Sequence, residues 1–320
     1  MMKKVLVIGA SGSLGKGFVK HIEDTAEVVA TYSSNEIMFD NAKTCKLDIT
    51  NENDFDLLDK DFDAVYLIAG AMPASMEGYN EQKYIDVNVT GTLNTLKFCK
   101  RNGIRKIIYI MTFSDVSGNF YNAVPIEDDQ AREINYTGDH ALYAISKISA
   151  QEIIKHYADE YGIQNITFRI PTVYCNDDNI NYYVDGVLKE KSFIQMIKSI
   201  RNNSRIELWG DVNNAKDMPY IKDFSNLLEK ALYNDKAYGI FNAGTHMPIS
   251  LEEFVDTLIK VFANGDLVEK IYLPENKSQP NFTFSMEKTY KEFDFKPLYS
   301  LEEAFSEIKI ALIDSGVIDG

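Results

Sequence analysis

The sequence lacks the features that mark membrane, secreted and metal-binding proteins. No apolar run approaches the ~20 residues that a membrane-spanning helix needs. The first apolar run, at residues 5–8, is too short for a signal peptide. The three cysteines are odd in number and far apart, and the four histidines are scattered. Neither a disulfide framework nor a metal site is therefore predicted, and we expect a cytoplasmic protein in a reducing compartment.

Positive charge is also scarce. The 320 residues include 33 Lys and Arg against 48 Asp and Glu, which gives a formal net charge of −15. A surface of this sign repels nucleic acid and anionic lipid, so neither is expected as a partner. The chain has no internal repeat and no linker rich in Pro or Gly. Its fractions of 45% hydrophobic and 25% charged residues are those of an ordinary globular protein.

The first half of the chain alternates short aliphatic runs with stretches of helical spacing. The helical stretches include residues 91–101 and 143–161, each followed closely by a glycine, which is a helix-stop signal. The alternation predicts a doubly wound parallel sheet with helices on both faces. The runs are rich in Val and Ile, as strands buried on both faces are, and comprise residues 5–8, 28–31, 64–69, 107–111 and 166–170.

The second half is less regular. Residues 175–185 are crowded with Asn, Asp and Tyr and predict a long loop beside a site. Two of them, Tyr182 and Tyr183, could stack on a base or simply pack. Later stretches at residues 251–262 and 301–313 have the spacing of amphipathic helices. We therefore expect a smaller C-terminal lobe that forms one compact body with the sheet.

A glycine-rich segment directly follows the first predicted strand. Gly9, Gly12 and Gly15 are spaced G-x-x-G-x-x-G, and a helix is predicted to begin near Ser13. Glycines let the backbone turn sharply and approach a pyrophosphate, while the helix N-terminus supplies free N–H donors. Although three glycines alone are a weak signal, their place between strand and helix favours a dinucleotide site.

The choice between NAD and NADP stays open from these residues. The second predicted strand ends at Ser33 and Ser34, with neither the acid that favours NAD nor a nearby Arg that favours NADP. Asp48 and Ile49 follow a further short strand. The Asp48 carboxylate could accept the adenine amine, although an Asp before Thr50 is also an ordinary helix-start signal.

A tyrosine and a lysine four residues apart are the strongest catalytic candidates. Tyr143 and Lys147 lie on one face of a predicted helix. At ~4 Å and an effective dielectric constant of ~20, an ammonium stabilises a phenolate by roughly 4 kcal/mol. We expect this attraction to bring the pKa of the phenol from ~10 toward neutrality, so that it can exchange a proton with a substrate hydroxyl.

The same spacing occurs at Tyr79 and Lys83, but that pair precedes the strand at residues 107–111, and Tyr79 is interpreted as a surface or packing tyrosine. This strand ends in two hydroxyl residues, Thr112 and Ser114. Either could orient a substrate oxygen at the sheet edge, or cap the strand. We rank Thr112 first as the catalytic hydroxyl and Ser114 second, as a substrate-binding residue.

Several short segments follow one another in an order typical of one family. They are residues 9–15, Asp48, residues 66–71, 88–92, 143–147, 169–175, 216–223 and 242–244. In this order they make nearly the whole chain similar to the extended short-chain dehydrogenases/reductases of the NAD-dependent epimerase/dehydratase family. No single segment would carry that resemblance.

The resemblance implies a Rossmann-type sheet of about seven strands, formed by residues 1–175 and 220–245. Residues 176–219 and 246–320 would form the substrate-binding lobe. The resemblance further implies NAD as cofactor, a nucleotide sugar as substrate, and a homodimer formed through two long helices, residues 88–101 and 143–161. The implied cofactor residues are Gly9, Ser11, Gly12, Ser13, Leu14, Gly15, Asp48, Ile49, Ala69, Gly70, Ala71, Asn88, Tyr143, Lys147, Ile170 and Val173.

Three departures from the family pattern bear on the reaction. Phe113 and Ser114 stand where 4,6-dehydratases carry an Asp–Glu pair, which disfavours a dehydratase. Lys216 replaces an Arg that grips the nucleotide diphosphate; it keeps the charge but loses the bidentate fork. Cys175 replaces a glycine and is interpreted as a small packed residue.

The leading hypothesis is an epimerase that inverts C4 of a nucleotide sugar through a transient 4-keto intermediate, with Thr112, Tyr143 and Lys147 as catalytic residues. One alternative is a 4-keto sugar nucleotide reductase that uses the same residues with exchangeable NAD(P)H. Another is a protein that senses NAD(P) without chemistry, against which the complete catalytic set argues.

Overall fold

The structure is a computed structural model that describes residues 2–122, 124–176, 179–184 and 186–319. Within these residues, one parallel sheet of seven strands has the order β11-β6-β5-β4-β1-β2-β3. The order reverses between β1 and β4, where sheets of this type open a crevice for ligands. The predicted fold class is confirmed. The strands are β1 (Lys4–Ile8), β2 (Glu27–Tyr32), β3 (Lys43–Lys46), β4 (Ala64–Leu67), β5 (Lys106–Thr112), β6 (Gln164–Ile170) and β11 (Gly239–Asn242).

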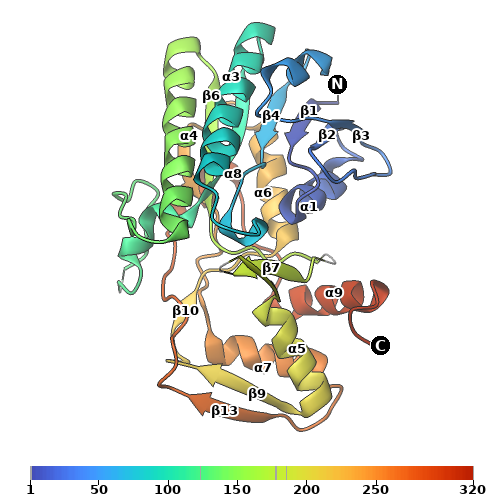
Figure 1. The fold of residues 1–320 in the computed structure, drawn as a ribbon, viewed down its shortest axis with the longest axis vertical. Coiled ribbons are helices and arrows are strands. Elements are labelled where there is room, and N and C mark those ends of the chain that lie inside the picture. The colour runs from blue at the N-terminus through green and yellow to red at the C-terminus, as the bar shows by residue number, and fades with distance from the viewer. Residues whose placement is uncertain (1, 123, 177–178, 185, 320) are drawn as a thin grey trace.

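Helices cover both faces of this sheet (Figure 1). Helices α1 (Ser13–Ile22) and α6 (Ile221–Tyr233) pack on one face, and α3 (Gly91–Asn102) and α4 (Asp139–Tyr161) on the other. Strand β1 explains the aliphatic runs: Val5 and Val7 belong to the first buried cluster, while Leu6 and Ile8 belong to the second. Alternate side chains of a strand point to opposite faces, so a strand covered twice is apolar throughout.

Short helical segments follow several of the strands at the C-terminal edge of the sheet. The segment before α3 comprises α2 (Glu81–Tyr84) and the π-helical η3 (Ile85–Thr90), and the 3-10 helices are η1 (Glu52–Leu57), η2 (Pro73–Ser75) and η4 (Phe113–Asn119). Helix α4 begins at Asp139, one turn earlier than the expected start at Tyr143. Gly138, at φ 80°, ends the preceding loop and starts the helix there.

A smaller lobe lies beyond the C-terminal ends of the strands (Figure 1). The expected amphipathic helices are present as α7 (Leu251–Phe262) and α9 (Leu301–Asp314). The division into two domains stays a prediction. Helix α8 (Glu287–Phe293), which we assigned to the small lobe, also contacts the large sheet, because the rings of Phe293 and Phe241 lie 4.9 Å apart. The other lobe elements are α5 (Ser192–Asn203), the parallel pair β9 (Arg205–Trp209) and β13 (Glu269–Leu273), and the antiparallel pair β10 (Ala215–Lys216) and β12 (Ile249–Ser250).

The prediction of a long loop at residues 175–185 is wrong in its second half. An antiparallel hairpin of β7 (Asn181–Val184) and β8 (Val187–Glu190) occupies that region. Asp185 and Gly186 separate the two strands in the sequence, and an Asp-Gly pair between strand-forming runs is a strong hairpin signal. Gly186 has φ +76°, which a glycine adopts without strain. Asp177, Asp178 and Asp185, which belong to the predicted loop, lie outside the described residues.

Candidate functional site

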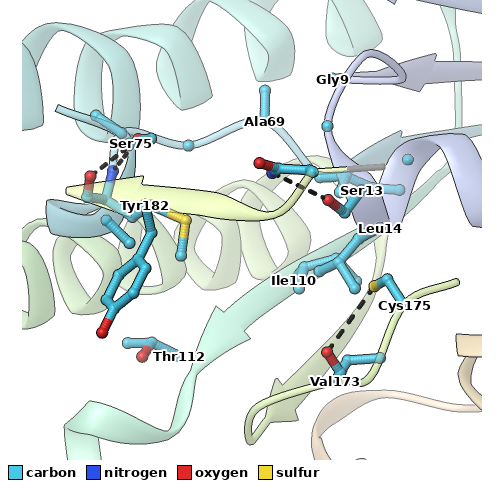
Figure 2. Close-up of a pocket in the computed structure, with 18 of the residues that line it drawn as sticks. Gly9, Ser13, Leu14, Ala69, Ser75, Ile110, Thr112, Val173, Cys175 and Tyr182 are labelled. Atoms are coloured by element: carbon cyan, nitrogen blue, oxygen red, sulfur yellow. Dashed lines mark hydrogen bonds between the residues drawn. The ribbon is translucent and has the colours of Figure 1, made fainter. Parts of the chain in front are cut away.

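A cavity of about 1510 Å³ opens at the C-terminal edge of the sheet (Figure 2). It extends from the loop after β1 to Lys216 of the small lobe. Of the residues expected to bind cofactor or to act in catalysis, all line this cavity except Asn88. The one sheet edge therefore brings together positions that are as far apart in sequence as Gly9 and Val173.

The loop between β1 and α1 forms one end of the cavity. Gly9 has φ +95°, and a Cβ at Gly15 would lie 2.3 Å from the carbonyl oxygen of Gly9. The turn can therefore close this tightly only with glycine at both positions. Helix α1 has no acidic residue in its first turn, and Ser13 and Leu14 face the cavity. Its free N–H groups and positive helix end make a cradle that fits a pyrophosphate.

Polar side chains at the ends of β2 and β3 line the adjoining part of the cavity. Ser33 and Ser34 follow β2, and Lys46 pairs with Tyr32 in the sheet. The Asp48 carboxylate accepts hydrogen bonds from the backbone N (2.9 Å) and hydroxyl (2.7 Å) of Thr50. Asp48 thus caps a turn and also faces the cavity, so both roles considered for it from the sequence are compatible with its position.

Tyr143 and Thr112 meet at the centre of the cavity. Thr112 is the last residue of β5, and Tyr143 lies in the second turn of α4. The two side chains lie close enough for Thr112 to lower the pKa of the Tyr143 phenol. Lys147, one turn further along α4, is 4% exposed and lines the same cavity. A phenol, a hydroxyl and an amine therefore converge on one space, which is the arrangement needed to move a proton at a substrate oxygen.

Burial dominates the protonation of this group. It raises the pKa of Tyr143, and the nearby Thr112 hydroxyl opposes that rise. Burial also lowers the pKa of Lys147 to about 7. The expected acidification of the phenol by Lys147 is therefore not seen in this structure, because a lysine that is itself half deprotonated near neutral pH is a weak electrostatic partner.

Asn88 does not line the cavity but holds two segments that do. Its buried amide accepts a hydrogen bond from the backbone N of Ala71 (2.7 Å) and donates to the carbonyl of Ala71 (2.9 Å) and the hydroxyl of Ser146 (2.8 Å). Ala71 lines the cavity and Ser146 precedes Lys147. Asn88 therefore joins the loop after β4 to helix α4 and positions both.

The two candidate hydroxyls are separated by the structure. Thr112 lines the cavity, whereas Ser114 is not among the lining residues and is hydrogen-bonded to Thr112, with 3.0 Å between the two oxygens. Phe113 lines the cavity and also packs against Phe282, with ring centroids 5.5 Å apart. Tyr79 is 55% exposed, as its interpretation as a surface residue requires.

Lys216 lies in the wall formed by the small lobe. Burial lowers the pKa of its ammonium, and no carboxylate among the described residues forms an ion pair with it. The neighbouring Asp217 is fully buried and accepts hydrogen bonds from the backbone N (2.5 Å) and hydroxyl (2.7 Å) of Thr245. Asp217 thus fixes the strand that presents Lys216. A half-buried cation that faces a cavity favours an anionic ligand.

Sequence reasoning missed one wall of the cavity. The segment after β4 contributes Met72, Ser75 and Lys83, and Tyr182 of the adjacent hairpin projects toward Thr112 (Figure 2). The Asp-Gly pair at 185–186 could have revealed the hairpin. No comparable signal marks residues 72–83, whose role follows only from the way η2 lies beside β7.

The part of the chain that the structure describes offers neither a metal site nor a membrane span. It contains no group of three or more His, Cys, Asp or Glu side chains that could hold a metal ion. None of its helices has both the length and the apolar character needed to cross a lipid bilayer.

Comparison with known proteins gives consistent matches. The model of the NAD dependent epimerase/dehydratase family matches residues 5–244. A UDP-glucuronate 4-epimerase of Thermodesulfobacterium geofontis is 28% identical over 296 residues, 89% of this chain and 84% of that protein. UDP-glucose 4-epimerase of Thermotoga maritima, solved with UDP-glucose, superposes with a TM-score of 0.79 at 19% identity, over 98% of this chain and 99% of that chain. The enzyme WbmG of Bordetella bronchiseptica, solved with NAD, has a TM-score of 0.77 at 17% identity, over 100% of this chain and 96% of that chain.

Proposed function

Because the chain belongs to the NAD dependent epimerase/dehydratase family, as its sequence motifs predicted, we propose that it inverts the C4 hydroxyl of a nucleotide sugar. The observation that carries this proposal is the convergence of Thr112, Tyr143 and Lys147 at the centre of a cavity large enough for a dinucleotide and a sugar nucleotide together. Two relatives described above are UDP-sugar 4-epimerases.

The glycine cradle after β1 supports NAD as the cofactor. Gly9 and Gly15 leave room where a Cβ would collide with backbone, and the N-terminus of α1 meets a pyrophosphate with free N–H donors. Lys147, beside Gly70, would hold the nicotinamide ribose, since a Cβ built at Gly70 would lie 3.5 Å from its amine. When bound, NAD supplies a hydride acceptor that is returned to its starting state in each cycle.

The side chains of this protein would handle the proton. Thr112 holds the C4 oxygen, and Tyr143 takes the proton of the C4 hydroxyl as the carbon is oxidised. The resulting 4-keto sugar turns within the cavity, and Tyr143 returns the proton when the ketone is reduced on its other face. Lys216 binds the diphosphate, which keeps the nucleotide in place while the sugar turns. A homodimer formed through α3 and α4 remains a prediction of the resemblance.

Replacing Tyr143 by Phe tests this function. We expect the Tyr143→Phe variant to retain NAD in native mass spectrometry and to form no C4 epimer from a panel of UDP-sugars, because the ring packs as before but carries no proton. Tyr79→Phe is the matched control, since Tyr79 has the same spacing to a lysine but is 55% exposed, and it should keep full activity. An active Tyr143→Phe enzyme would overturn the proposal.

A second candidate, a 4-keto sugar nucleotide reductase, is supported by the end of β2. Ser33, Ser34 and Lys46 line the cavity without an acidic residue among them, and such a surface accepts the 2′-phosphate of NADPH. Absorbance of the reduced nicotinamide distinguishes the two reactions. A reductase consumes one equivalent of reduced cofactor for each 4-keto sugar, whereas an epimerase causes no net change.

A further inference from the structure

Two segments of the protein must stay in register for the proposed chemistry. Thr112 caps η4, where its side chain accepts a hydrogen bond from the backbone N of Ser114 (3.1 Å). Tyr143 belongs to α4, which is separated from η4 by a long connection, residues 120–138. Whatever holds η4 against α4 therefore sets the distance between the two catalytic oxygens.

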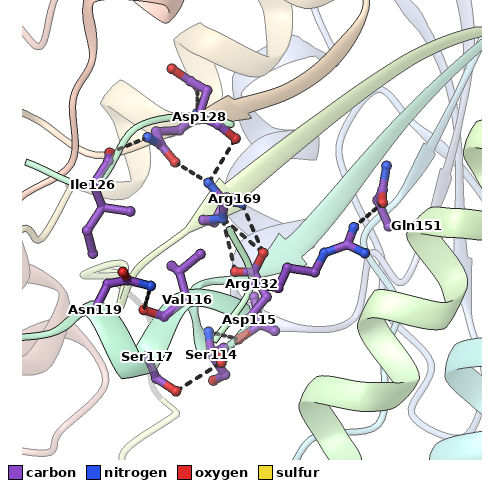
Figure 3. Close-up of polar contacts among 12 residues, drawn as sticks. Ser114, Asp115, Val116, Ser117, Asn119, Ile126, Asp128, Arg132, Gln151 and Arg169 are labelled. Carbon is purple, nitrogen blue, oxygen red and sulfur yellow. Dashed lines mark hydrogen bonds and ion pairs between the residues drawn. The ribbon is translucent and has the colours of Figure 1, made fainter. Parts of the chain in front are cut away.

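Residues 130–133 of this connection, which we call the strap, return to pair with η4 (Figure 3). The backbone N of Glu133 donates to the carbonyl of Asp115 (3.0 Å), and the backbone N of Gly118 donates to the carbonyl of Glu133 (2.8 Å). The Gln130 amide donates to the side chain of Asn119 (2.9 Å). With a longer one from the Asn119 amide to the carbonyl of Ala131 (3.5 Å), these hydrogen bonds fasten the strap along η4.

The side of η4 that faces the sheet is fixed by a buried ion pair. The Asp115 carboxylate is fully buried. It accepts hydrogen bonds from Nε (3.0 Å) and Nη2 (3.0 Å) of Arg169. Arg169 also donates to the side chain of Asn242 (2.9 Å), so the pair is anchored across β6 and β11. A buried pair with this fork geometry holds its partners firmly, because separating them leaves a charge in the interior.

Arg132 connects the strap to the catalytic helix. Its guanidinium donates to Oε1 of Gln151 (2.5 Å) and Oε1 of Glu152 (2.6 Å), both on α4. Gln151 is 3% exposed and lies one turn beyond Lys147 and two turns beyond Tyr143. Figure 3 shows the Arg132 side chain reaching to Gln151 of this helix.

We propose that Arg132 is a positioning residue of the active site, which fixes α4 against η4 and so keeps the Tyr143 hydroxyl close to Thr112. It touches neither cofactor nor substrate, since it is not among the residues that line the cavity. This inference rests on the proposed function for its effect on catalysis, but the contacts that it invokes can be tested without turnover.

The test compares Arg132→Leu with Arg132→Lys and with a control variant on α4, the helix that Arg132 contacts. Lys155→Leu is that control, because it removes an exposed i,i+4 ion pair with Asp159 (2.7 Å) that has no part in the strap. In Arg132→Leu we expect faster amide exchange in residues 112–119 and 139–147 and a fall in kcat of at least ~10-fold with little change in KM. Arg132→Lys should recover part of both effects, because an ammonium replaces only some of the fork's hydrogen bonds.

The pH profile separates positioning from a general loss of stability. Thr112 lowers the pKa of Tyr143, so moving the two side chains apart should shift the rise of kcat with pH to more alkaline values in Arg132→Leu but not in Lys155→Leu. If amide exchange in both segments equals that of the wild type, the inference is wrong whatever the activity. If Arg132→Leu and Lys155→Leu lose activity equally, the inference is also wrong. If the wild-type protein has no turnover, the proposed function is contradicted. The amide-exchange comparison would then still test whether Arg132 fixes α4 against η4.

Discussion

The amine nitrogen of Lys147 lies 4.3 Å from the centre of the Tyr109 ring, inside the protein and 4% exposed. The ring face offers a weak electrostatic attraction to the ammonium. That attraction does not compensate for the loss of water, because the pKa of Lys147 is lowered to about 7. Lys147 therefore destabilises the folded protein whenever it is charged.

This burial predicts how stability varies with pH. An unfolded chain keeps Lys147 protonated up to its ordinary pKa of 10.5, whereas the folded protein releases the proton above about 7. The unfolded state therefore binds more protons between these values, and the lysine's destabilising effect, complete below pH 7, declines as pH rises. Its full size is roughly 5 kcal/mol at about 1.4 kcal/mol per pKa unit. Lys147→Met should be more stable than the wild type in urea unfolding at about pH 6, and the gap should narrow by about pH 9. A gap that widens with pH would contradict this.

The loop after β1 yields a prediction with a matched pair of glycines. A Cβ at Gly15 would lie 2.3 Å from the Gly9 oxygen, whereas a Cβ at Gly12 would meet its nearest atom at 3.7 Å, an ordinary contact. Gly15→Ala must therefore displace the loop backbone, and Gly12→Ala need not. We expect thermal unfolding to show a fall in Tm for Gly15→Ala and little change for Gly12→Ala. Calorimetric titration should show weaker NAD binding by Gly15→Ala, and equal Tm values for the two variants would contradict this account.

Much of this architecture could be predicted because its signals are local. The strands buried on both faces appear as continuous aliphatic runs, such as Leu6 and Val7 of β1, and the glycine loop lies directly between strand and helix. The spacing of Tyr143 and Lys147 on one helix fixes their relative position without knowledge of the rest of the fold. The glycine loop and the Tyr143–Lys147 pair, which we propose as the cofactor end and the catalytic centre, could therefore be found in the sequence.

The rest depends on contacts between distant residues. Nothing local in Arg132 indicates that it reaches α4, and nothing in Asp115 indicates that Arg169, 54 residues away, will neutralise it. The pKa of Tyr143 was misjudged for the same reason: helical spacing brings Lys147 near, but only the fold determines how deeply both groups are buried.

Asn88 is predicted to matter more than its distance from the cavity suggests. Asn88→Ala removes three buried hydrogen bonds and leaves the N–H of Ala71 without that acceptor. An unsatisfied buried polar group costs about 1–3 kcal/mol, so unfolding in urea should show a loss of at least that size. Asn88→Asp keeps an acceptor for Ala71 but loses both donors. Its free energy of unfolding should lie between those of Asn88→Ala and the wild type. If Asn88→Ala is as stable as the wild type, these hydrogen bonds do not stabilise the segment at Ala71, and the prediction is wrong.

Lys216 provides the sharpest test of where the substrate's negative charge lies. Burial lowers the pKa of its ammonium, and a bound diphosphate would restore the charge by pairing with it. Lys216→Met should therefore raise KM for the nucleotide sugar by at least ~10-fold, about 1.4 kcal/mol, while NAD affinity stays unchanged.

Lys216→Arg should restore binding, since the guanidinium stays charged and adds a bidentate fork. The pH dependence gives an independent check: wild-type affinity for the sugar nucleotide should fall as pH rises through the lowered pKa of Lys216, and that fall should disappear in Lys216→Arg. If KM of Lys216→Met equals that of the wild type, the diphosphate binds elsewhere in the cavity, and the small lobe contacts the sugar nucleotide through other residues.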